Sequence, residues 1–86
     1  MKPSSIIYVT APWCTACHAT LPLVKTVSAQ KGVPIEILDL GVPEDEARAV
    51  PLSVTALPTI VGDLNGRELW RLTGAVGRAA LDAVLH

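Results

Sequence analysis

Two cysteines, Cys14 and Cys17, are the residues of this chain best suited to chemistry, and its 86 residues contain no others of their kind. Because only two residues separate them, a disulfide between them closes a loop too short to constrain much of the unfolded chain. In a reducing compartment, such a pair is more often a metal site or a thiol couple that cycles between two oxidation states. The spacing therefore favours redox or metal chemistry over a structural crosslink.

The predicted secondary structure distinguishes the two sulfurs. Residues 5–10 are rich in β-branched and aromatic side chains, which are typical of a buried strand. Apolar side chains then recur every three or four residues and predict a helix from about Cys14 to Lys31. A sulfur in the first turn of a helix lies near unpaired N–H groups, which lower the pKa of a thiol. We therefore expect Cys14 to be the nucleophile, and the more buried Cys17, one turn later, to be the resolving thiol.

His18 and Trp13 flank this pair. His18 is a candidate modulator, because an imidazole with an unperturbed pKa of about 6.5 could supply charge or transfer a proton beside the thiols. A solvated position on the helix surface is the plainer interpretation of this histidine. Trp13 is either a core residue or a partly exposed contact for partners.

The rest of the chain predicts short alternating elements separated by Gly and Pro. We expect strands at residues 35–40, 59–61 and 68–72, and helices at residues 43–50 and 78–85. Asn65-Gly66 is a strong hairpin signal, so the last two strands should be antiparallel. The expected fold is α/β, in the order βαβαββα, with a four-stranded mixed sheet and helices on both faces. We expect residues 1–86 to form a single domain.

Composition and charge limit the classes of partner. The chain has 7 basic and 8 acidic residues, and the basic ones are scattered from Lys2 to Arg78. This pattern predicts no binding to nucleic acid or anionic lipid. No run approaches the roughly 20 apolar residues that span a bilayer, and the apolar stretch near the N-terminus is shorter than a signal-peptide core. We expect a cytoplasmic monomer with no membrane attachment.

Several short motifs resemble the thioredoxin family over nearly the whole chain, apart from the family's leading strand and helix. They are Trp13-Cys14-Thr15-Ala16-Cys17, Pro22, Leu57-Pro58-Thr59, Asn65-Gly66 and Thr73-Gly74-Ala75. The resemblance implies a minimal thiol–disulfide oxidoreductase with no cofactor beyond its own Cys14–Cys17 disulfide. Its partners would be proteins or small molecules that contain disulfides, and a reductase or thiol donor.

The resemblance also implies a docking surface around the thiols. In thioredoxin-like proteins, the proline that matches Pro58 is cis and faces the dithiol. The residue before it, here Leu57, hydrogen-bonds the substrate backbone. The implied substrate-binding residues are Trp13, Leu57, Pro58, Thr73, Gly74 and Ala75.

Three positions depart from the thioredoxin pattern. Thr15-Ala16 stands where the family has Gly-Pro, so the family's reduction potential does not carry over. Tyr8 aligns with the family's buried aspartate, which removes the usual proton acceptor for the second cysteine. His18 replaces the family's lysine. The start at residues 8–12 and the Cys-His pair are also similar to glutaredoxin, but the Thr-Val-Pro and Gly-Gly elements that hold glutathione are missing.

Other interpretations of the cysteines come from different classes of protein. Residues 14–18 fit the C-x-x-C-H pattern of c-type haem attachment. Met1, the only methionine, and the terminal His86 are poor second axial ligands, and the predicted strands disagree with an all-helical haem fold. A zinc site needs four ligands, and the neighbouring Cys17 and His18 do not easily face one ion. We expect no metal site.

Two alternatives keep the predicted fold. One is a non-catalytic thioredoxin-fold module that uses the same surface only for binding. The other is a glutaredoxin-like protein that binds glutathione or shares an iron–sulfur cluster between two chains. Turnover of a disulfide substrate would separate an enzyme from a binding module, and colour with acid-labile sulfide would reveal a cluster.

Overall fold

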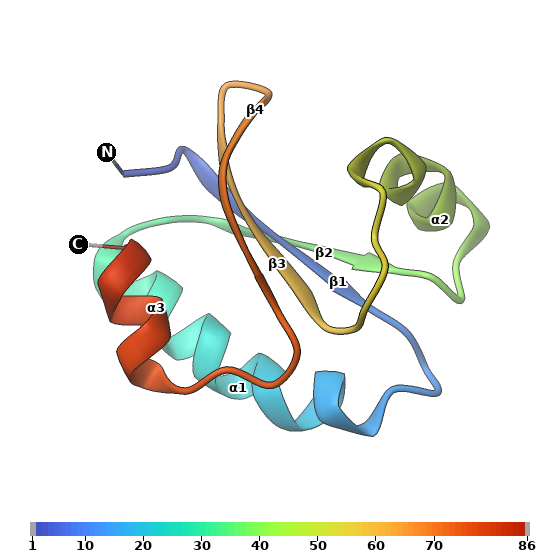
Figure 1. Cartoon of the computed structure of the whole chain (residues 1–86), viewed down its shortest axis with the longest axis horizontal. Coiled ribbons are helices and arrows are strands. Elements are labelled where there is room, and N and C mark those ends of the chain that lie inside the picture. The colour runs from blue at the N-terminus through green and yellow to red at the C-terminus, as the bar shows by residue number, and fades with distance from the viewer. Residues whose placement is uncertain (1, 86) are drawn as a thin grey trace.

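The computed structural model describes residues 2–85, so the haem and zinc arguments on Met1 and His86 lie outside the described residues. The elements are β1 (Ser5–Thr10), α1 (Thr15–Lys31), β2 (Ile35–Asp39), α2 (Pro43–Ala49), the 3₁₀ turn η1 (Val50–Leu52), β3 (Thr59–Leu64), β4 (Arg67–Thr73) and α3 (Arg78–Val84). Figure 1 shows their arrangement. The expected order βαβαββα is confirmed, with η1 added after α2.

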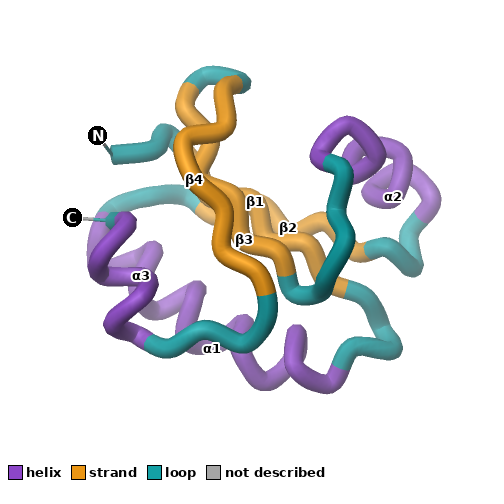
Figure 2. Tube along the Cα trace, in the orientation of Figure 1, coloured by secondary structure: helices purple, strands orange, loops and turns teal. Residues whose placement is uncertain are grey.

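The four strands form one mixed sheet in the order β2-β1-β3-β4. β1 pairs with β2 in parallel, whereas β1 with β3 and β3 with β4 are antiparallel. α1 and α3 lie on one face of this sheet and α2 lies on the other (Figure 2). Helices on both faces are therefore confirmed.

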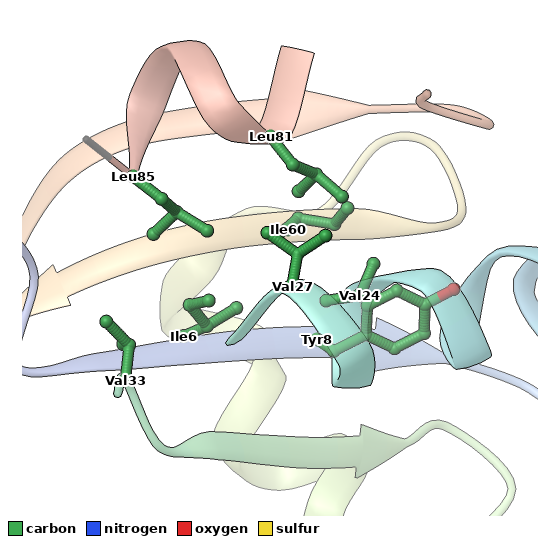
Figure 3. Close-up of a cluster of buried hydrophobic side chains, with 8 residues drawn as sticks. All are labelled: Ile6, Tyr8, Val24, Val27, Val33, Ile60, Leu81 and Leu85. Carbon is green, nitrogen blue, oxygen red and sulfur yellow. The ribbon is translucent and has the colours of Figure 1, made fainter. Parts of the chain in front are cut away.

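Alternation along β1 divides the core into two clusters, because successive side chains of a strand point to opposite faces. Ile6 and Tyr8 pack with side chains of α1 and α3, including Val24 and Leu81 (Figure 3). Val9 packs on the other face with Leu38 and Ala49. β1 is thus buried on both sides of the sheet.

α1 begins at Thr15, one residue after the predicted start at about Cys14, and ends at Lys31 as predicted. Cys14 has extended backbone angles, with φ −102° and ψ 98°, and is the N-cap rather than the first helical residue. The buried face of the helix includes Thr20, which is polar, whereas Leu21 is half-buried. Gly32, whose φ of 70° is left-handed, caps this end of the helix.

β3 is twice as long as predicted. It continues to Leu64 because its antiparallel pairing with β1 extends to Asp63 opposite Ser5. Asn65 and Gly66 then turn the chain with φ of 52° and 90°. Both positive values are typical of a tight hairpin turn, so that prediction is confirmed.

Candidate active site

The two cysteines lie where β1 gives way to α1. They form a disulfide, and their Cα atoms are 5.3 Å apart. The backbone N–H of Cys17 donates a hydrogen bond to Cys14 Sγ at 3.1 Å. Cys14 is half-buried, whereas Cys17 is fully buried. One sulfur therefore faces solvent at a helix N-terminus, and the other lies behind it.

Tyr8 lies beneath the second cysteine. Its side chain is fully buried, and its hydroxyl donates a hydrogen bond to the backbone carbonyl of Cys17 at 2.6 Å. Burial raises the pKa of the Tyr8 phenol above its usual value of 10.0. The hydroxyl therefore stays protonated near neutral pH, and it ties the first turn of α1 to β1.

A cis peptide bond joins Leu57 to Pro58. Pro58 is buried, and its carbonyl accepts a hydrogen bond from the N–H of Gly74 at 2.9 Å. The Thr59 hydroxyl donates to the carbonyl of Ala56 at 2.6 Å. These bonds fix the loop before β3 against the end of β4.

An open cleft of about 490 Å³ lies directly beside Cys14. Its lining consists of Trp13, Cys14, Leu40, Val54, Thr55, Ala56 and Leu57. Trp13 stands at this cleft with 69% of its surface exposed. The lining is mostly apolar, so the cleft suits a partner that brings apolar groups to the sulfur.

Four of the lining residues were not predicted from the sequence: Leu40, Val54, Thr55 and Ala56. Leu40 directly follows β2, which is parallel to β1, so it ends at the same edge of the sheet as Cys14. That edge rule for parallel strands could have located Leu40. The other three residues lie in the loop before Pro58, and nothing local in their types marks them.

The remaining predicted site residues, Pro58, Thr73, Gly74, Ala75 and His18, are not part of the lining of this cleft. Thr73 pairs with Thr59 across the sheet, and Gly74 is bonded to Pro58, so both lie beside the cis proline. Ala75 follows them and is exposed. His18 is exposed on α1, with Nε2 3.4 Å from the carbonyl oxygen of Pro12.

The described part of the chain offers neither a cluster of metal ligands nor a membrane-spanning helix. Within residues 2–85, no group of three or more His, Cys, Asp or Glu side chains is placed to hold a metal ion. No helix in the same range is long and apolar enough to cross a membrane.

A family model described as Thioredoxin matches residues 1–86. The chain belongs to the thioredoxin family. A thioredoxin of Mycolicibacterium smegmatis is 32% identical over 73 residues, which cover 83% of this chain and 65% of that protein. Thioredoxin 1 of Thermosipho africanus has the same fold, with a TM-score of 0.81 and 21% identity over 93% of this chain and 88% of that chain.

A third thioredoxin relative joins two activities in its name. It is a bifunctional thioredoxin reductase/thioredoxin of Mycobacterium leprae, 27% identical over 71 residues, which cover 83% of this chain and 16% of that protein. The chain spans less than two thirds of the length of the first curated thioredoxins that it matches, 65% in Mycolicibacterium smegmatis and 61% in Mycobacterium tuberculosis.

Proposed function

We propose that this member of the thioredoxin family is a thiol–disulfide oxidoreductase that reduces disulfides in proteins. One observation carries the proposal: Cys14 Sγ accepts the N–H of Cys17 at the start of α1 and also lines an open cleft. A hydrogen bond to sulfur and the positive end of a helix both favour the thiolate, which is the nucleophile in disulfide exchange.

The reaction needs only the two sulfurs and the substrate. In the reduced protein, the Cys14 thiolate attacks one sulfur of a substrate disulfide, and the other substrate sulfur leaves as a thiolate. The Cys17 thiolate then attacks Cys14 Sγ and releases the second substrate thiolate. The substrate gains two electrons, and the protein is left with the Cys14–Cys17 disulfide.

The surrounding residues are proposed to dock the substrate. Trp13 and Leu57 line the cleft beside Cys14 and offer apolar surface, and the backbone of Leu57 would hydrogen-bond the substrate chain. Pro58 and the residues beside it, Thr73, Gly74 and Ala75, would form a wall next to this cleft. His18 would modulate the thiols from the exposed side of α1.

The proposed partners are proteins with accessible disulfides and an electron donor that restores the dithiol. A thioredoxin reductase is the donor that we favour, because one relative carries reductase and thioredoxin in a single name. We further propose a cytoplasmic location, where thiols of this kind are kept reduced between turnovers.

Serine substitutions of the two cysteines test the assignment of roles. Cys17→Ser should form a stable mixed disulfide with a model substrate such as insulin, because no thiol remains to displace it. Cys14→Ser should neither reduce insulin nor be trapped, because the remaining thiol is fully buried. Mass spectrometry of the protein after reaction distinguishes the two cases. Trapping by Cys14→Ser, or wild-type rates in either variant, would overturn the roles, and tight binding without turnover in the wild type would indicate a binding module.

A further inference from the structure

The cleft beside Cys14 continues into a second depression over α2 and η1. This second cleft has a volume of about 280 Å³ and is lined by Leu40, Glu46, Ala49, Val50, Ser53 and Val54. Leu40 and Val54 line both clefts. The two depressions therefore adjoin at these side chains, and we refer to the two clefts together as the groove.

Most of this groove is apolar, and the cleft over α2 and η1 is lined in part by an exposed aliphatic side chain. Val50 has 71% of its surface exposed, about as much as Trp13 in the cleft beside Cys14. Large apolar side chains in both parts of a concave surface suit a ligand that is long enough to contact both. An extended polypeptide segment has this shape, because it adds about 3.3 Å for each residue.

Glu46 is the only charged side chain in the lining of either cleft. It is exposed, and it forms no ion pair with any other residue in the range 2–85. The arginines of the neighbouring elements are already engaged. Arg48 pairs with Glu36 at 2.6 Å, and Arg71 pairs with Glu68 at 2.7 Å.

We propose that this groove selects extended polypeptide substrates in which a lysine or arginine near the disulfide reaches Glu46. Apolar residues of the substrate would lie on Leu40 and Val54 while its disulfide meets Cys14. The inference rests on the proposed function and names the substrate class of that site. An acidic ligand such as glutathione, which has two carboxylates, would instead meet a charge of the same sign.

Matched peptides test this specificity. Each peptide carries one cysteine in a mixed disulfide with 2-mercaptoethanol, within an otherwise apolar sequence. A lysine or a glutamate is placed two, four or six residues from the cysteine on either side. The measurement is the second-order rate constant for reduction of each peptide by the reduced protein. At the best position, the lysine peptide should react about two- to fivefold faster than its glutamate counterpart, as an exposed ion pair of up to about 1 kcal/mol allows. In 1 M salt, where the Debye length is about 3 Å, this advantage should disappear.

Two variants in the same helical turn make the test specific. Glu46→Gln should bring the rates of the lysine and glutamate peptides together. Glu44→Gln removes a neighbouring exposed carboxylate that lines neither cleft, so it should keep the preference. Equal rates for the two peptides in the wild type, or a preference that survives Glu46→Gln, would overturn the inference while leaving the proposed function intact. Failure to reduce any peptide would instead contradict the proposed function.

Discussion

In the part of the chain that the structure describes, Cys14 and Cys17 differ in that only the sulfur of Cys14 accepts a hydrogen bond from a backbone N–H at the start of α1. This N–H belongs to Cys17 itself and donates to Cys14 Sγ, so the outer sulfur is the N-cap acceptor of the helix. The inner sulfur is fully buried behind it. The proposed order of attack follows from this asymmetry, since the half-buried Cys14 thiolate at the cleft would meet the substrate first and the buried Cys17 thiolate would reach only Cys14.

The buried hydroxyl of Tyr8 is predicted to stabilise the folded protein. Tyr8→Phe should lower the free energy of unfolding by about 1 kcal/mol near pH 7, because the hydrogen bond to the carbonyl of Cys17 is lost. Above pH 10, the wild type should lose stability that the variant keeps. The unfolded chain then releases the phenol proton while the folded chain, whose Tyr8 pKa is raised, retains it.

The measurement is urea unfolding of both proteins in the oxidised state at pH 7 and pH 10.5. Tyr8 is the only tyrosine in the chain. If the difference in free energy of unfolding between the two proteins changes with pH, that change therefore reports on the Tyr8 phenol. The difference in free energy of unfolding between the wild type and Tyr8→Phe should be smaller at pH 10.5 than at pH 7, by at most about 1.4 kcal/mol per pH unit. A difference that is constant with pH would contradict the burial argument.

Among the elements, β4 holds the wall of the groove in place through Arg71. Its Nη2 donates to the carbonyl of Leu52 at 2.6 Å and to Glu68 at 2.7 Å. Leu52 ends η1, and the chain continues from there into the loop that lines both clefts. Arg71 therefore joins the sheet to the loop that is proposed to face the substrate.

Arg71→Gln should loosen this loop without altering the sulfurs. We expect faster hydrogen exchange in residues 52–57 and a KM for protein disulfides raised about threefold, with kcat little changed, because the lost bond positions the docking surface only. Glu68→Gln is the matched control, since it removes the ion pair but leaves the bond to Leu52. Equal exchange in the loop of Arg71→Gln and the wild type would refute this role.

Gly62 and Trp70 face each other across β3 and β4. A Cβ at position 62 would lie 2.3 Å from Cε2 of Trp70, so Gly62→Ala should force the ring or the strand to move. We expect a loss of about 1–3 kcal/mol in the free energy of unfolding. Gly77→Ala, where a Cβ meets nothing within 4 Å, should cost less. Thermal or urea unfolding that ranks the two variants in the opposite order would contradict this close contact between Gly62 and Trp70.

Local signals predicted the elements that local chemistry determines. The helix start at the C-x-x-C motif and the Asn65-Gly66 turn depend on neighbouring residues, and the structure has both. The length of β3 depends on its pairing with β1, which overrides the low strand propensity of Gly62 and Asp63. The cleft depends on side chains from separate segments, such as Leu40 and Val54, so the sequence alone did not bring them together.

For the whole molecule, β1 is the shared element of the two cores. The cluster around Ile6 and Tyr8 and the cluster around Val9 lie on opposite sides of the same strand. We propose that residues 1–86 fold as one domain, because separating the clusters would expose both faces of β1. A single unfolding transition, coincident by fluorescence and circular dichroism, is the expected result.

Cys14 and Cys17 are proposed to form a couple that cycles between dithiol and disulfide rather than a permanent crosslink. The most direct test equilibrates the protein in glutathione buffers of graded potential, then alkylates it and counts modified thiols by mass spectrometry. We predict a single two-electron transition in which both thiols appear together, at a potential between about −120 and −270 mV, as in known catalytic couples. A disulfide that stays closed below about −300 mV, as structural disulfides do, or thiols that appear independently, would contradict the account.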